Sequence, residues 1–265
     1  PGRGTGGEWK RMGVAGTRRG RGGGRGRGGD AKGGRRRRDL RRLVENVKEA
    51  VARGSWEEAL EQVSDARASG LELDGSAHTA AVHAALEGGG DRLVLAAIAD
   101  MRADGFVPNA SLYNKAISLC GRKGEWKDAL FLLRDAQKVS AGVDVVTFSA
   151  AVAACRNGGE WEQALSLMEE MQAAGIQADQ IAFGTAVSAC AMGGRWRQAV
   201  TLLGDMRRAG LRPDVIAYSS AIKACGVEGR WQEALELLQE MRENGVRPNL
   251  ITYTGGTSSI DVDGR

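Results

Sequence analysis

The sequence predicts an all-α protein, a right-handed superhelical solenoid of stacked antiparallel helix pairs. Two unrelated residue types support this, because both recur at one interval of 35 residues. The cysteines are Cys120, Cys155, Cys190 and Cys225. The tryptophans on the same interval are Trp126, Trp161, Trp196 and Trp231, with Trp56 two intervals before Trp126. A fixed period of this length is typical of repeat proteins whose units stack on their neighbours.

Each unit is predicted to contain two short helices. Apolar residues recur at three- and four-residue steps from Ala164 to Met171, which indicates a helix. The pair Gly158-Gly159 precedes this helix, and Gly175 follows it as a C-cap. An earlier apolar stretch, from Thr147 to Cys155, has helical length as well. One such hairpin cannot bury its own apolar face, so neighbouring hairpins must stack.

The interval divides the chain into a basic segment, an array of six repeats and an incomplete unit. Residues 1–39 are rich in Gly and Arg, and we expect them to be disordered because they contain too little apolar surface to bury. The repeats are 40–74, 75–109, 110–144, 145–179, 180–214 and 215–249. Residues 250–265 read as the truncated start of a seventh repeat.

Charge is unevenly distributed along the chain. Residues 1–42 carry 15 Lys/Arg against 3 Asp/Glu, whereas residues 43–265 carry 22 against 30. A basic arm before an acidic body is typical of proteins with a polyanion-binding tail. For residues 18–38 two interpretations stay open: auxiliary, sequence-independent RNA binding, and a solvated linker or remnant of a transit peptide.

The beginning of each unit resembles the pentatricopeptide repeat. The motif is Pro213-Asp214-Val-Ile-Ala-Tyr218, followed by Ala234-Leu, Met241 and Gly245, and it starts again at Pro248-Asn249-Leu-Ile-Thr-Tyr253. The resemblance covers residues 40 to about 254. It implies binding of single-stranded RNA at one base per repeat, mainly in mitochondria and chloroplasts. It also implies a role in RNA processing, stability or translation.

The resemblance implies which side chains read RNA. In this family the fifth and last residues of a unit contact one base edge, and the second residue packs against base faces. The base-reading pairs are then Thr79/Asn109, Asn114/Asp144, Ser149/Asp179, Gly184/Asp214 and Ser219/Asn249. The base-packing residues are Val146, Ile181, Ile216 and Ile251, while Ser76 and Ser111 depart from that pattern. The family's pairing preferences predict a target of 5′-A-U-G-N-A-3′, with Gly184/Asp214 discriminating poorly.

The acidic body requires a local source of positive charge, because phosphate contacts usually dominate affinity for nucleic acid. We expect Arg122, Lys123 and Arg156 to provide it near the groove.

No residue set predicts catalysis, a metal site or a cofactor. The cysteines lie on separate hairpins, unlike the close pairs that bind zinc, so we expect core packing. The tryptophans are expected to pack between helices rather than stack on bases. His78 and His83 lack an accompanying nucleophile or carboxylate cluster.

Two other functions remain open besides RNA binding. The groove could hold a peptide, making the protein an interaction scaffold with protein partners. The recurrent Asp or Asn at each unit's end argues against this, since a peptide groove gives no reason to keep it. The array could also be the RNA-binding arm of a larger RNA-processing enzyme such as a protein-only ribonuclease P. No apolar run is long enough to cross a bilayer.

Overall fold

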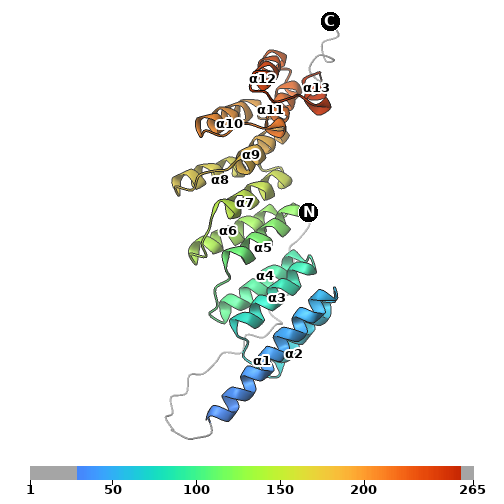
Figure 1. Ribbon diagram of the computed structural model, residues 1–265, viewed down its shortest axis with the longest axis vertical. Coiled ribbons are helices and arrows are strands. Elements are labelled where there is room, and N and C mark those ends of the chain that lie inside the picture. The colour runs from blue at the N-terminus through green and yellow to red at the C-terminus, as the bar shows by residue number, and fades with distance from the viewer. Residues whose placement is uncertain (1–28, 258–265) are drawn as a thin grey trace, which may run out of the picture. The chain divides into compact units, whose positions relative to one another are not determined.

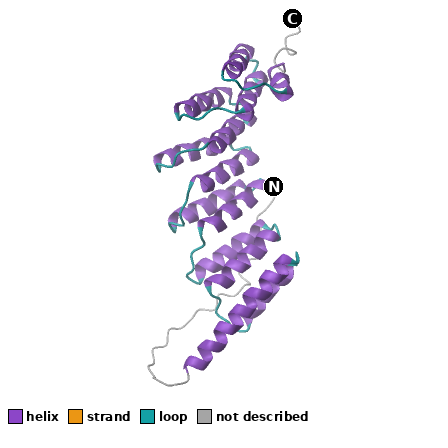
Figure 2. Ribbon diagram, viewed as in Figure 1, coloured by secondary structure: helices purple, strands orange, loops and turns teal. Residues whose placement is uncertain are grey.

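The computed structural model describes residues 29–257, and every regular element in that range is a helix (Figure 2). The chain divides into two units, residues 1–39 and residues 40–265. In the second unit, helix pairs follow one another in chain order as a solenoid (Figure 1). The predicted all-α solenoid is therefore confirmed.

The expected disorder of residues 1–39 is wrong for residues 29–39, which are helical. They begin α1 (Gly29–Ala52). The apolar residues of α1, from Leu40 to Ala50, are buried against α2 (Trp56–Ala68) and α3 (Gly75–Glu87). Once such packing forms a helix, extending it is cheap, and the run Arg35–Arg38 has good helix propensity. The prediction for residues 1–28, like that for residues 258–265, falls outside the described residues.

The remaining helices form pairs, and each first helix begins on a predicted unit boundary. The first helices are α3, α5 (Ala110–Arg122), α7 (Val145–Gly158), α9 (Gln180–Met192), α11 (Val215–Val227) and α13 (Leu250–Thr257). The second helices are α4 (Asp91–Ala103), α6 (Trp126–Lys138), α8 (Trp161–Ala173), α10 (Trp196–Arg208) and α12 (Trp231–Glu243).

First helices stack directly on one another, while each second helix packs against first helices. The contact positions between first helices hold small residues. All four cysteines are fully buried in the core, and none forms a disulfide. Burial raises the pKa of each thiol to about 11, so the thiols stay protonated and unreactive. The cysteines therefore pack in the core, as expected.

Three of the tryptophans pack across the junctions between repeats. Trp56 lies against Gly88 of the next repeat, where an added Cβ would be only 2.6 Å from the indole. Trp126 meets Gly158 and Trp161 meets Gly193 in the same way, even more closely. At these three junctions the indole occupies the space of a side chain, which glycine leaves open. At the junction of Trp196 the equivalent residue is Glu228. At the first three positions tryptophan has a structural role, and its partner is the following repeat, whereas Trp231 is 51% exposed.

The repeat that lacks tryptophan has changed both sides of this contact. Asp91 stands at the tryptophan position, and Lys123 stands where the next repeat would have glycine. The Lys123 ammonium lies 3.2 Å from the Asp91 carboxylate. An ion pair thus replaces the indole–glycine contact, and Lys123 is not available as the RNA-facing charge that the sequence suggested.

Alanine at Gly158 should destabilise the protein by about 1–3 kcal/mol, because its methyl group would overlap the Trp126 ring. Gly184 is the matched control, since it is also helical and has nothing within 4 Å of an added Cβ. Gly184→Ala should raise stability by about 0.5–1 kcal/mol through helix propensity. Urea unfolding of both variants measures the difference. Equal effects would contradict the junction contact.

A second set of junction contacts involves one acidic residue on each second helix from α4 to α12. These ladder acids are Asp100, Asp135, Glu170, Asp205 and Glu240. Four of them pair with an arginine of the preceding repeat: Asp100 with Arg67, Asp135 with Arg102, Glu170 with Arg134, and Glu240 with Arg207. Because these pairs are partly exposed, each contributes no more than about 1 kcal/mol.

Two of the ladder acids also accept a hydrogen bond from a tyrosine on the first helix of their own repeat. The Tyr113 hydroxyl donates to Asp135 at 2.6 Å, and the Tyr218 hydroxyl donates to Glu240 at 2.6 Å. Burial raises the pKa of both phenols to about 12, which keeps them as neutral donors. Asp205 differs from the other ladder acids: its only described partner is Arg208 of its own helix.

His78 occupies the place of these aromatic residues in α3. Its side chain is buried, its ring lies 5.4 Å from that of Phe106, and its Nε2 is 3.0 Å from an Asp104 oxygen. Burial lowers the pKa of His78, and the attraction of Asp104 only partly offsets that effect. The neutral imidazole is therefore the form that the fold favours.

Stability should fall as the pH drops below the ordinary histidine pKa of 6.5, because the unfolded chain then binds protons that folded His78 binds less readily. His78→Phe should reduce this loss. Burial also lowers the pKa of His83, so part of the dependence remains. Urea unfolding at pH 7.5 and about pH 5.5 tests this, and an unchanged pH dependence in the variant would contradict it.

Candidate nucleic-acid interface

The last residue of each repeat caps the first helix of the next. In every case a side-chain Oδ1 accepts a hydrogen bond from the backbone N–H three residues on, at 2.8–3.0 Å. The capping residues are Asp74, Asn109, Asp144, Asp179, Asp214 and Asn249. Asp and Asn are among the preferred N-cap residues. Capping alone gives any array of this kind a reason to keep them, so their recurrence does not exclude a peptide groove.

Capping uses one of the two polar atoms of each side chain. The second has its own partner in at least one case, since Asp214 Oδ2 accepts from the Gln180 side chain at 3.3 Å. At Asp144, partial burial alone would raise the pKa of the carboxyl. Hydrogen bonds from the Thr147 backbone and hydroxyl and from Asn114 instead hold that pKa below its usual value. Asp144 is therefore ionised at neutral pH, and its side chain meets that of Asn114. The predicted pair Asn114/Asp144 is brought together in space.

The fifth residues lie one turn into the first helices, but their surroundings differ. The Asn114 Oδ1 and the Ser149 hydroxyl are buried atoms without a hydrogen-bond partner among the described residues. The Thr79 hydroxyl donates to the Gly75 carbonyl at 2.7 Å. Unpaired buried polar atoms are costly, so Asn114 and Ser149 are the positions best prepared for a partner.

Two other fifth residues differ from the expected arrangement. Ser219 is buried, and its hydroxyl is 2.7 Å from that of Thr252, which in turn donates to Asn249. The pair Ser219/Asn249 is thus connected through Thr252, and the serine hydroxyl already has a partner. Gly184 contributes no side chain and faces open space. Its pair with Asp214 can read a base through one residue only.

The predicted base-packing residues form a row of exposed aliphatic side chains. Val146, Ile181, Ile216 and Ile251 are 54%, 69%, 66% and 64% exposed, each at the start of a first helix. Single exposed apolar residues are ordinary, but a row at one repeated position serves no core. Ser76 and Ser111 are exposed at the same position in the first two units of the row.

Positive charge lies on the helices that carry this row. The first helices from α3 to α11 contain one acidic residue, Glu87, and four basic ones. The basic residues are Lys115, Arg122, Arg156 and Lys223. The negative charge of the repeats is concentrated on second helices, where the ladder arginines neutralise part of it.

Two of these cations were not identified from the sequence. Lys223 is exposed two helical turns after Ile216 on the same face, and Lys115 is exposed one turn after Ser111. Helical spacing from the second residue of each unit could have identified both. Arg122 is exposed as expected, and the Arg156 guanidinium donates to the Asn157 side chain.

No group of side chains within residues 29–257 is arranged to hold a metal ion. In the same range, no helix combines the length and apolar character of a membrane span.

Asp179→Ala should destabilise the protein by about 1 kcal/mol, because the Ala182 N–H would lose the acceptor that lies 2.8 Å away. Asp179→Asn keeps an acceptor oxygen, so its stability should stay close to that of the wild type. Thermal unfolding followed by circular dichroism compares the three proteins. An alanine variant as stable as the wild type would contradict the capping role.

The fold and this surface define a helical-hairpin solenoid with a repeated row of polar and aliphatic side chains along its first helices. The pentatricopeptide repeat domain matches residues 63–123, 166–228 and 201–255, and the PPR repeat matches 111–138 and 146–176. The chain belongs to the pentatricopeptide-repeat family. No curated protein matches the sequence.

Several solved structures share the fold. PPR10 in complex with an 18-nt psaJ RNA element is 27% identical with a TM-score of 0.66, over 87% of this chain and 34% of that one. PPR10 from maize is 25% identical with a TM-score of 0.59, over 80% and 30%. Nuclear proteinaceous RNase P 2 from A. thaliana, at 20% identity and a TM-score of 0.55 over 63% and 38%, is similar in fold alone. This chain thus spans about a third of PPR10.

Proposed function

We propose that the protein binds single-stranded RNA along its first helices, with one base at each junction between repeats. The observation that carries this proposal is the exposed row from Val146 to Ile251. Branched aliphatic side chains at this spacing suit the flat faces of successive bases, and the polar atoms beside them suit base edges. The similarity to PPR10, which was solved with RNA, supports this function.

Electrostatics favour the same surface. Lys115, Arg122 and Lys223 form no ion pair with any described residue, whereas the arginines of the ladder are paired. Phosphates would therefore meet positive charge on the first helices even though residues 43–265 are acidic. Ser and Thr can also cap helices, yet all six capping residues are Asp or Asn. Base recognition accounts for that narrower choice.

The biological role follows as a proposal from the family. We place the protein in the processing, stability or translation of a transcript in a mitochondrion or chloroplast. It would act by binding RNA rather than by catalysing a reaction. The expected target remains 5′-A-U-G-N-A-3′, in which Asn114/Asp144 and Ser149/Asp179 read the second and third bases.

Asp179→Asn tests base recognition without removing the helix cap. The pair Ser149/Asp179 is expected to favour guanine, whereas the variant would have the Ser and Asn combination of Ser219/Asn249, which is expected to favour adenine. The ratio of affinities for 5′-A-U-G-N-A-3′ and 5′-A-U-A-N-A-3′ should shift roughly tenfold or more toward the second RNA. Fluorescence anisotropy of the full chain with labelled RNAs measures this ratio.

Ile216→Ser is the companion variant, because it should weaken binding to both RNAs alike while stability is unchanged. A contribution of the basic N-terminal segment that adds equally to the free energy of both complexes cancels in the ratio. An unchanged ratio for Asp179→Asn would refute base recognition at this junction. Equal affinity of the wild type for 5′-A-U-G-N-A-3′ and a scrambled pentamer would refute the predicted target.

A further inference from the structure

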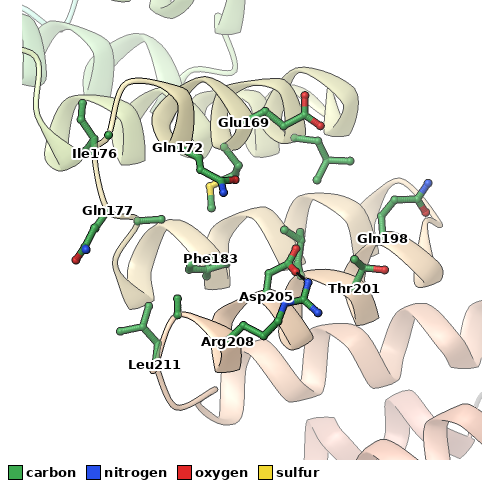
Figure 3. Close-up of a pocket in the computed structure, with 16 residues that line it drawn as sticks. Glu169, Gln172, Ile176, Gln177, Phe183, Gln198, Thr201, Asp205, Arg208 and Leu211 are labelled. Carbon is green, nitrogen blue, oxygen red and sulfur yellow. Dashed lines mark hydrogen bonds and ion pairs between the residues drawn. The ribbon is translucent and has the colours of Figure 1, made fainter.

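A groove of about 970 Å³ lies between α8 and α10, among the second helices (Figure 3). Leu165, Met168 and Leu202 contribute apolar side chains to it, and Phe183 of α9 lies between the two helices. The polar side chains of Gln172 and Asp205 face each other across it. The groove involves none of the exposed row that the RNA proposal uses.

The groove lies at the described junction where the ladder of ion pairs is interrupted. At the other junctions an arginine of the preceding repeat binds the ladder acid. Arg67, Arg102 and Arg207 occupy one repeated position, and Gln172 occupies that position here. Arg134 lies three residues before that position in its own repeat. The equivalent residue in the repeat of α8 is Glu169. No guanidinium from α8 can therefore reach Asp205.

Asp205 also lacks the second kind of partner. Tyr113 and Tyr218 donate their hydroxyls to the ladder acids of their own repeats, but the equivalent residue here is Phe183, which has no donor. The remaining partner, Arg208, is three residues away on the same helix, and its side chain is 75% exposed. A surface pair of this kind is weak and readily exchanged.

We propose that this groove binds a peptide segment of a partner protein through an arginine, whose guanidinium takes the place on Asp205 that a ladder arginine takes elsewhere. An apolar side chain next to that arginine would lie against Leu165, Met168 and Leu202. Guanidinium suits this position because it binds a carboxylate through two parallel hydrogen bonds. Glu169 adds a second negative charge to the rim. With two carboxylates against the one guanidinium of Arg208, the lining is net negative, which disfavours a phosphate backbone and suits a peptide rather than RNA.

A synthetic array of twelve-residue peptides tests this proposal. Each peptide has leucine or methionine at three- and four-residue steps around a central arginine, lysine or citrulline. Citrulline has the shape of arginine without its charge. The full-length protein should bind the best arginine peptides at least tenfold more tightly than their citrulline counterparts. Equal binding of both series, or no binding of either, would overturn the proposal.

Two variants and a control locate the site. Asp205→Asn should abolish the preference for arginine. Gln172→Arg should abolish it as well, by restoring an internal guanidinium, and should not lower the melting temperature, so misfolding cannot explain the loss. Glu162→Gln changes an exposed acid of α8 that does not line the groove, and binding should be unaffected. Retained preference in Gln172→Arg would overturn the assignment. RNA affinity should be the same in all three variants, which separates this site from the RNA proposal.

Discussion

The close approach of neighbouring first helices is the constraint on which the rest of this structure depends. Where α5 and α7 come closest, the residues on both sides of the contact are small. A Cβ on Gly121, for example, would lie 3.0 Å from that of Ala154 in the next helix. Ala189 and Ala224 are buried at the position equivalent to Ala154. Because first helices stack this tightly, the exposed residues at their starts recur at a regular spacing, and a repeated surface results.

The two helices of each repeat have separate roles. First helices carry small core residues, the exposed aliphatic row and, from α3 to α11, four basic residues against one acid. Second helices carry the acids, and their arginines connect one repeat to the next. This separation explains how an acidic array can present a surface suited to a polyanion, since few of its acids lie on the first helices. It also explains why an interrupted ion pair opens a groove away from that surface.

Junction contacts vary in chemistry while keeping their geometry. At one junction the ring of Trp126 packs against the backbone of Gly158. At the equivalent place in another junction, Lys123 forms an ion pair with Asp91. In the same way, Arg102 pairs with Asp135 and Arg134 pairs with Glu170, although the two arginines lie on different turns of their helices. At Asp91 and Lys123 both sides of the contact differ together. At Asp205 the ladder acid is present, but the arginine and the tyrosine that bind the acid elsewhere are both replaced.

Much of the candidate site was predictable because it depends on local interactions and on position within a repeat. The polar pairs and the exposed aliphatic residues could be placed by counting from the unit boundary. Position within a repeat could not show whether a polar side chain already has a partner in the protein. Ser219 is buried against Thr252 of the next repeat, and Lys123 is held by Asp91 of the preceding one. Both contacts join residues far apart in the chain.

The sequence by itself determined the period, the helix pairs and the residues at which first helices begin. Those features depend on side chains three or four residues apart and on caps such as Asp179, which binds the N–H of Ala182. Only the tertiary structure decided which charges are neutralised, where tryptophan packs and where a groove opens. These features depend on pairs such as Arg102 with Asp135 and Arg134 with Glu170, which adjoin only after the repeats have stacked.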